Sequence, residues 1–370
     1  MLRSPRVLHL IHSGAIGGGP RVVLELASRA VGVHTIAAAG DGPLLSAAAC
    51  RGLATLRVPF AGKYSFAASL SLLNHWFRRA DLVHLHGQFA GFYGALAARL
   101  SGTPAIYTAH FPSFITDSNR RNRVRNHLAE WLPSKVSTKV ITCSETSRHE
   151  YISRGLVEPE RIVTIYNGVL SEQPTCSPAA LRAELGLAQD DLVVAAVGRF
   201  TDQKGFDILI DAVPSLLQSV PAAKVVLVGD GEKRAELGRQ TRELGVSAAV
   251  RFTGFRSDTV NVLHAADVVA VPSRFDVFPL VPLEAMMAER PVVASDLPAM
   301  REAIDQGATG LLVPASPGPF AQALAHLLTD AGRRREIGRN AGIAARERFG
   351  VDLMIRQYDA LYGCIAGSMA

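Results

Sequence analysis

Two acidic side chains, Asp276 and Glu284, lie at the ends of a short apolar loop that also contains two prolines. Carboxylates accept hydrogen bonds from hydroxyl groups, so the pair suits a ligand that carries diols, such as ribose or a hexose. The loop follows a predicted strand and leads into a helix that we expect to begin at Pro282, because proline suits the first helical position. Glu284 is then expected in the first helical turn, and the amides of Leu280 and Val281 can face a phosphate.

A second loop, GRFTDQKG, carries Arg199 and Lys204 just past the end of another predicted strand. An arginine fork and a lysine point charge can hold the same anion. The alternative interpretation is a pair of exposed loop cations with no ligand.

A third loop, GAIGGGP, ends the first predicted strand and contains Gly17 and Gly18. Glycines let backbone amides approach a ligand, and a helix start after such a loop favours an anion; a tight turn is the alternative. The loop is not a dinucleotide fingerprint, because Ile16 and Val22 stand where that pattern needs glycine. This argues against an NAD-dependent oxidoreductase.

Alternating strand-like and helix-like segments along the whole chain would position these loops, as in doubly wound α/β folds. The predicted strands are RVLHLIHS, VHTIAAAG, ATLRVPF, DLVHLHG, PAIYTAH, KVITCSE and RIVTIYNG, then LVVAAVGRF, KVVLVGDG, VRFTGF, DVVAVPS, PVVAS and GLLVP. The chain has 370 residues, too many for one ordinary core. A polar linker at 171–180 separates an expected first domain, 1–172, from a second, 173–350; a closing helix in 351–370 is expected to pack toward the first domain.

Composition narrows the class of protein. The net charge is +6, but residues 1–172 carry +9 and the remainder −3, which favours an anionic substrate or membrane. Nucleic acid is disfavoured, because no nucleic-acid-binding motif is present. The four cysteines are scattered, which favours a reducing, cytoplasmic location. No run of eighteen apolar residues occurs, so no transmembrane helix is expected. The first apolar run is short and contains two histidines, so we expect a strand there instead of a signal peptide.

The second half of the sequence resembles the retaining glycosyltransferases of family four, which have the GT-B architecture of two Rossmann-like domains facing a central cleft. The matching segments are GRFTDQKGFDILIDA, LVGDGE, VRFTGF, ADVVAVPSRFDVFPLVPLEAMMAERPVVAS and REAIDQGATGLLVP. The first half resembles the family more weakly, through GAIGGGPRVVLELA, DLVHLHG, YTAHF and TIYNGV.

The resemblance implies a role for each candidate residue of the second half. Arg199 and Lys204 would hold the donor diphosphate and stabilise the leaving nucleotide, and Glu284 would bind the ribose. Asp276 replaces the first glutamate of the family's E-x7-E pattern near the donor sugar, and is shorter by one methylene. Further donor contacts are expected at Phe278, Pro279, Leu280 and Val281.

In the first half, the resemblance implies that Gly17 and Gly18 close over the donor and that His110 faces the transferred sugar. Pro20 departs from the family, which often has glutamate there. No metal or other cofactor is expected, because no carboxylate cluster suited to Mg²⁺ or Mn²⁺ is evident.

The implied reaction moves a hexosyl-type sugar from a UDP-sugar, or secondly a GDP-sugar, to a saccharide, a lipid-linked acceptor or a small metabolite, with retention at the anomeric carbon. Two alternatives stay open. One is a sugar-nucleotide epimerase of the same architecture, which would need an acid/base set, and the other is a sugar-binding protein without catalysis.

Two further features have competing interpretations. His84 and His86 alternate on one strand and, with His110, could bind a metal, although structural histidines are the favoured interpretation. A basic segment around residues 120–132 suits either an anionic membrane surface or, as favoured, a helix packed on the core; its cations and apolar residues are Arg120, Arg121, Arg123, Arg125, Val124, Leu128, Trp131 and Leu132.

Overall fold

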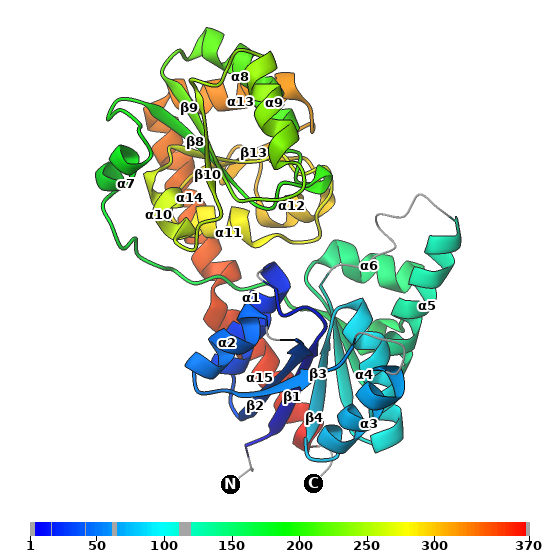
Figure 1. Ribbon diagram of the computed structural model, residues 1–370. Coiled ribbons are helices and arrows are strands. Elements are labelled where there is room, and N and C mark those ends of the chain that lie inside the picture. The colour runs from blue at the N-terminus through cyan, green and yellow to red at the C-terminus, as the bar shows by residue number, and fades with distance from the viewer. Residues whose placement is uncertain (1–3, 16, 41, 61–64, 111–119, 368–370) are drawn as a thin grey trace. The chain divides into compact units, whose positions relative to one another are not determined.

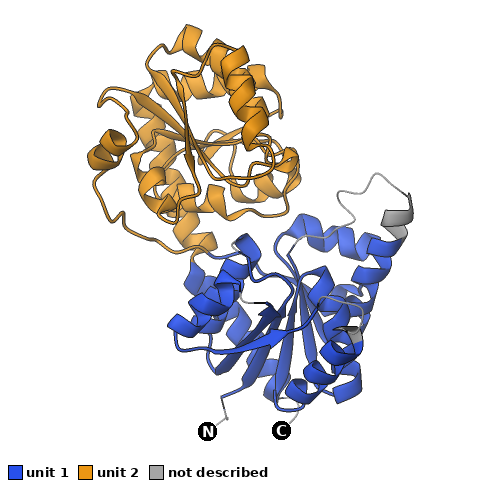
Figure 2. Ribbon diagram, in the orientation of Figure 1, with its two compact units in different colours: residues 1–168, 351–370 blue, residues 169–350 orange. Residues whose placement is uncertain are grey.

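The computed structural model describes residues 4–15, 17–40, 42–60, 65–110 and 120–367. These residues form two compact units, coloured separately in Figure 2. Unit 1 comprises residues 1–168 and 351–370, and unit 2 comprises residues 169–350. The last helix of the chain, α15 (Val351–Gly367), therefore belongs to the same unit as the first strand.

Unit 1 contains a seven-stranded parallel sheet in the order β3-β2-β1-β4-β5-β6-β7 (Figure 1). Its strands are β1 (Arg6–Ile11), β2 (Val33–Ala39), β3 (Ala54–Val58), β4 (Leu82–His86), β5 (Ala105–Ala109), β6 (Lys139–Thr142) and β7 (Ile162–Thr164). Its other helices are α1 (Gly18–Arg29), α2 (Pro43–Cys50), α3 (Ser65–Phe77), α4 (Gln88–Ser101), α5 (Arg120–Val136) and α6 (Glu145–Ser153).

Unit 2 contains a six-stranded parallel sheet in the order β10-β9-β8-β11-β12-β13. Its strands are β8 (Leu192–Val197), β9 (Ala223–Val228), β10 (Val250–Gly254), β11 (Val268–Val271), β12 (Val292–Ser295) and β13 (Gly310–Val313). Its helices are α7 (Pro178–Glu184), α8 (Phe206–Ser219), α9 (Arg234–Glu243), α10 (Thr259–Ala265), α11 (Leu280–Met287), α12 (Pro298–Ala303), α13 (Pro317–Thr329) and α14 (Ala331–Phe349).

The predicted doubly wound α/β architecture is confirmed. Each predicted strand segment contains a strand, and central strands such as β4 and β5 are buried at every residue, as expected where helices cover both faces of a parallel sheet. In both sheets the strand order reverses beside the first strand of the unit, between β1 and β4 and between β8 and β11. Open α/β sheets bind ligands beyond the carboxyl ends of the strands at such a reversal.

Among the described residues, no helix is both long and apolar enough to span a membrane.

Candidate active site

Strands β8 and β11 pair side by side, so the loops that follow them meet at the carboxyl edge of the unit 2 sheet. Gly205 ends a 3₁₀ turn in the first loop with φ +63°, and a Cβ there would lie 2.1 Å from the carbonyl oxygen of Pro272 in the second loop. Only glycine fits both the left-handed backbone and this close approach. The local sequence Lys204–Gly205 therefore sets the lysine directly beside the second loop.

Lys204 and Asp276 form an ion pair, with Lys204 Nζ 2.6 Å from Asp276 Oδ2. The Asp276 side chain is only 8% exposed, compared with 23% for Lys204. The backbone N–H of Val277 donates to Asp276 Oδ1 at 3.1 Å, and Ser273 Oγ donates to Asp276 Oδ2 at 3.4 Å. The structure thus joins the cation predicted for the phosphates to the acid predicted for the sugar.

A second ion pair joins the same two loops, and the sequence did not predict it. Arg274 donates through Nη1 to Asp207 Oδ1 at 2.8 Å and to the carbonyl oxygen of Asp202 at 3.0 Å. The hydrogen bonds from Arg274 lower the pKa of Asp207. No local pattern identifies the pair, because its partners come together only through the pairing of β8 with β11.

Helix α11 begins at Leu280, two residues before the predicted start at Pro282, and this prediction is wrong. Pro282 is the third helical residue, where a missing N–H costs no intrahelical hydrogen bond. Glu284 is consequently the fifth helical residue and lies in the second turn, half-buried. Leu280 and Val281 open the helix, so their N–H groups have no acceptor within it.

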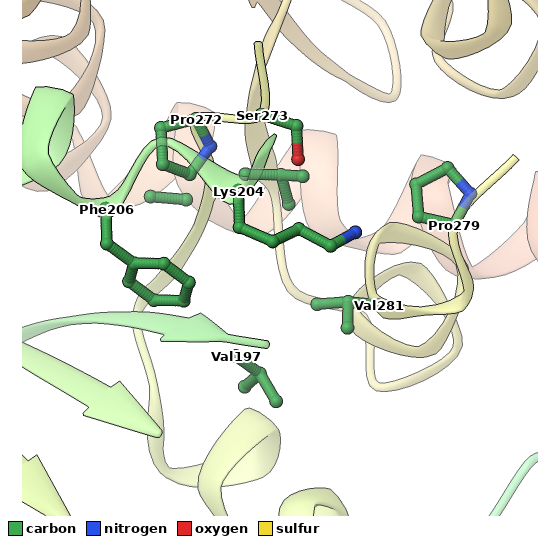
Figure 3. Close-up of a pocket in the computed structure, with 9 residues that line it drawn as sticks. Val197, Lys204, Phe206, Pro272, Ser273, Pro279 and Val281 are labelled. Atoms are coloured by element: carbon green, nitrogen blue, oxygen red, sulfur yellow. The ribbon is translucent and has the colours of Figure 1, made fainter. Parts of the chain in front are cut away.

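Figure 3 shows a small pocket at this edge, with the Lys204 side chain extending between Ser273, Pro279 and Val281. The neighbouring Phe278 side chain is buried and packs edge-on against Phe349, with ring centroids 5.5 Å apart. A ligand contact at Phe278 would therefore come from its backbone.

Arg199 lies in the same loop as Lys204, one residue after Gly198, and its side chain is exposed. A Cβ at Gly198 would lie 3.7 Å from Lys204 Cγ, so the lysine stem passes beside the backbone next to Arg199. The structure places both cations on one loop.

In unit 1, Gly17 caps α1 and Gly18 is its first residue, with no side chain capping the helix and no acid in its first turn. The last glycine of the loop, Gly19, lies beside His110: a Cβ at Gly19 would be 3.7 Å from the His110 ring. This helix start and His110 therefore share one edge of the unit 1 sheet.

His110 directly follows β5 and is half-buried. Its Nε2 lies 3.0 Å from His86 Nδ1, and its Nδ1 lies 3.9 Å from Cys143 Sγ. Burial lowers the pKa of His110 to about 4. The imidazole is therefore neutral near pH 7.

The histidines offer one candidate metal cluster among the described residues, made of His9, His84 and His86 instead of the predicted group that included His110. Both ring nitrogens of His84 are already hydrogen-bonded, to Tyr362 Oη at 2.8 Å and to Thr108 Oγ1 at 2.7 Å. Both nitrogens of His9 and of His86 also have imidazole partners. This geometry fits the structural interpretation better than a metal site.

Helix α5 faces the core, as the favoured interpretation expects, but part of its apolar surface stays exposed. Leu132 packs on the core, but Leu128 is 56% exposed and Trp131 is 43% exposed. Arg125 is exposed as well. The side chains of Arg120, Arg121, Arg123 and Val124 lie outside the described residues.

Two doubly wound units in one chain are the architecture of the GT-B glycosyltransferases, and comparisons with known proteins agree with this class. Residues 179–343 match the model of the family Glycosyl transferases group 1, and residues 16–173 match that of Glycosyltransferase Family 4. The chain belongs to the group 1 glycosyltransferases.

Three individual proteins illustrate this similarity. An uncharacterized glycosyltransferase of Methanocaldococcus jannaschii is 31% identical over 76% of this chain and 75% of its own length. A D-inositol 3-phosphate glycosyltransferase of Kribbella flavida is 30% identical over 78% of this chain and 72% of its own. The crystal structure of HepE of Anabaena in complex with UDP-glucose is 27% identical, with a TM-score of 0.87 over 99% of each chain.

Proposed function

We propose that this enzyme transfers a hexosyl-type sugar from a nucleoside-diphosphate sugar to an acceptor hydroxyl with retention at the anomeric carbon. A UDP-sugar is the preferred donor, and a GDP-sugar is second. The observation that carries the proposal is the Lys204–Asp276 pair beside the start of α11, at the strand reversal of unit 2. The similarity to HepE, which was crystallised with UDP-glucose, supports the choice of UDP.

Each part of this edge suits one part of such a donor. Lys204 and Arg199 are cations for the diphosphate, and the N–H groups of Leu280 and Val281 add donors at a helix start. Glu284 accepts hydrogen bonds from the ribose hydroxyls. Asp276 accepts a hydrogen bond from a hydroxyl group of the sugar.

The proposed reaction follows from where charge develops. The bond between the anomeric carbon and the phosphate oxygen breaks, and the acceptor hydroxyl oxygen forms the new bond on the same face of the sugar. The hydroxyl proton passes to the departing phosphate. Lys204, Arg199 and the helix-start amides stabilise the diphosphate, which is electrostatic catalysis without a required metal or other cofactor.

The proposed roles in unit 1 come from the family resemblance. Gly17 and Gly18 would approach the donor through their amides, and His110 would contact the transferred sugar as a neutral imidazole. The acceptor is a saccharide, a lipid-linked glycan or a small metabolite of polysaccharide or glycoside synthesis.

We place the enzyme in the cytoplasm, with a peripheral contact between α5 and anionic lipid. Leu128 and Trp131 are exposed apolar side chains, and Arg125 is an exposed cation on the same helix. An interfacial helix needs both features.

Thermal unfolding in the presence of UDP, GDP, ADP, NAD and the common UDP- and GDP-sugars, without metal, tests the donor. A ligand at a hundred times its Kd stabilises the folded protein by about 2.7 kcal/mol. We expect UDP or its sugars to raise the Tm, and Glu284→Ala to abolish the rise. A shift by NAD alone, or by no nucleotide, would contradict the proposal.

Product analysis separates the remaining alternatives. Transfer of the sugar to an acceptor, with the anomeric configuration followed by NMR, supports a retaining transferase. Conversion of one UDP-sugar into its epimer would identify an epimerase instead. Sugar binding without turnover would identify a binding protein.

A further inference from the structure

Four imidazoles form a continuous hydrogen-bonded row through unit 1, which we call the histidine chain: His34, His9, His86 and His110. His34 Nδ1 lies 2.9 Å from His9 Nε2, His9 Nδ1 lies 3.2 Å from His86 Nε2, and His86 Nδ1 lies 3.0 Å from His110 Nε2. The row follows the sheet order, because β2, β1, β4 and β5 are successive neighbours. It ends at the edge where α1 begins.

The interior of the histidine chain is closed to solvent. His9 is 0% exposed, His86 2% and His34 5%. Helix α15 contributes Tyr362, whose ring lies 6.3 Å from that of His9 and 6.1 Å from that of His34. Burial, together with the neighbouring imidazoles, lowers the pKa of His9 and His86 well below the usual value. Each ring is thus neutral and carries a single N–H.

A row of neutral imidazoles has only two well-paired states. When one ring donates through Nε2, its neighbour must accept at Nδ1 and donate through its own Nε2, and so on to the end. Any break in this order leaves two N–H groups, or two lone pairs, facing each other across a buried contact. The tautomer of His110 is therefore coupled to that of His34, three rings away.

The two ends favour the same state. At the outer end, burial lowers the pKa of His34, so this ring is neutral as well, while the backbone of Val31, the Asp359 carboxylate and the backbone of Ala30 oppose the shift. These acceptors favour an N–H on the side of the ring that faces them. The Asp359 carboxylate is fixed there, because it accepts from the N–H of Val31 at 2.8 Å. His34 Nδ1 faces His9, so an N–H directed at these acceptors lies on Nε2, although this buried atom makes no hydrogen bond to a described residue.

At the inner end, His110 Nδ1 faces the Cys143 sulfur. Burial raises the pKa of the Cys143 thiol to about 12, and a side-chain hydrogen bond with Asn167 opposes this shift. The thiol therefore keeps its proton, and with Asn167 at the sulfur its S–H can serve as the weak donor to His110. His110 Nδ1 is then the acceptor, and its proton lies on Nε2, directed at His86. Both ends thus select the state with every proton on Nε2.

We propose that the histidine chain positions His110, with His86 as the residue that fixes its Nε2–H tautomer and holds its ring beside the start of α1. The proposal rests on the sugar-contacting role proposed for His110. With its Nε2–H donated to His86, the His110 ring has only the Nδ1 lone pair left for a substrate hydroxyl, which would replace the long contact with Cys143. An untethered ring would sample both tautomers.

Long-range ¹H–¹⁵N spectra of the full-length protein, labelled at histidine, test the chain without any substrate. In the wild type we expect His9, His86 and His110 to be neutral and protonated on Nε2. Protonation of His9 or His86 on Nδ1, or a cationic ring, would overturn the proposal. So would zinc bound by His9, His84 and His86 in protein purified without chelator, since the metal would occupy nitrogens that the chain uses.

Two variants test the coupling. His34→Phe removes the acceptor for His9 Nε2–H, so the row is expected to reverse and His110 to become protonated on Nδ1. His84→Gln is the matched control, because His84 is 0% exposed on the same strand as His86 but is bonded outside the chain; it should leave the His110 tautomer unchanged. An unchanged tautomer in His34→Phe, or an equal change in the control, contradicts the coupling.

Kinetics connects the chain to activity. Outer partners that orient metal-bound histidines are worth about 10–100-fold in activity. By analogy we expect His86→Leu to lower kcat by that factor with little change in the KM for the donor. His86→Gln should restore part of the rate, because its amide oxygen can accept from His110 Nε2–H. If kcat falls while the His110 tautomer stays wild-type, His86 has only a structural role and the proposal fails.

These measurements separate this proposal from the proposed function. The spectra report on the chain even if no transferase activity is found with any donor. A missing activity with the expected tautomers would defeat the proposed function and leave the coupling of the rings standing.

Discussion

Lys204 and Asp276 lie 72 residues apart in the sequence, yet their charged atoms are 2.6 Å apart in unit 2. The aspartate thus neutralises the lysine proposed to hold the donor diphosphate. A bound diphosphate must share Lys204 with Asp276, which makes the carboxylate a competitor for the anion as well as a sugar ligand.

Asp276→Asn and Lys204→Ala are therefore expected to change UDP affinity in opposite directions. Asp276→Asn removes the competing charge and should tighten UDP binding by up to about fivefold, while the loss of the sugar contact slows transfer. Lys204→Ala should weaken UDP about 10–100-fold, since a hydrogen bond to a charged group is worth about 1.5–3 kcal/mol. Isothermal titration measures both.

Lys224→Ala is the control for the lysine variant, because Lys224 lies at the amino end of β9, at the opposite edge of the sheet. Its UDP affinity should equal that of the wild type. Weaker UDP binding in Asp276→Asn would show that the ion pair supports the anion site instead of competing with it.

Gly205→Ala is expected to destabilise unit 2 because of both its backbone angle and its contact with Pro272. A non-glycine residue in the left-handed region costs about 1–3 kcal/mol, and here the added Cβ would also lie 2.1 Å from a carbonyl oxygen. Gly245→Ala is matched, since Gly245 has φ +69° and nothing within 4 Å of its Cβ position. Chemical unfolding should show a larger loss for Gly205→Ala, together with weaker UDP binding. Equal losses of stability in the two variants would mean that the close approach of Gly205 to Pro272 contributes nothing beyond the backbone angle.

Buried neutral histidines predict a loss of stability in mild acid. The pKa values of His9, His84 and His86 are held well below the usual 6.5, chiefly by burial. Below pH 6.5 these histidines bind protons in the unfolded chain but stay neutral in the folded protein. The free energy of unfolding therefore falls as the pH falls, by about 1.4 kcal/mol per pH unit for each such histidine.

Urea unfolding at pH 7.5 and pH 5.5 measures this slope. His84→Gln should show a shallower dependence than the wild type, because one titrating group is gone. A wild-type unfolding free energy that stays constant between the two pH values would show that these rings accept protons in the folded state.

The exposed apolar side chains of α5 predict binding to anionic vesicles. Flotation with vesicles of phosphatidylglycerol and phosphatidylcholine should recover the wild-type protein, and Trp131→Ser should weaken binding about tenfold or more, because burying a large apolar side chain is worth about 1.5–3 kcal/mol. Ile343→Ser is the control: Ile343 is 46% exposed on α14 of unit 2. Equal losses for both variants, or no dependence on anionic lipid, would exclude a docking role for α5.

The strands could be predicted from the sequence because a parallel sheet covered on both faces requires short, continuous apolar runs. The start of α11 was placed two residues late, because Pro282 was taken as the first helical residue, although the N–H groups of the whole first turn lack partners within a helix. For α5, the apolar spacing predicted a core-facing helix but could not show that Leu128 and Trp131 stay exposed.

The candidate site could be predicted only as separate loops. Alternation placed His84 and His86 on one face, but the partner His9 depends on the register between β1 and β4. The same is true of Arg274 and Asp207, whose contact depends on the pairing of β8 with β11. Relationships of this kind are set by strand order, which no local pattern encodes.

The position of α15 has a consequence for how the protein is made. Unit 1 needs Tyr358, Asp359 and Tyr362 beside its histidines, yet the ribosome adds these residues only after all of unit 2. Unit 2 is one continuous segment and can fold as it emerges, as domains generally do during synthesis. Unit 1 can be completed only after α15 has been synthesised, and until then the histidines that Tyr362 packs against lack this cover.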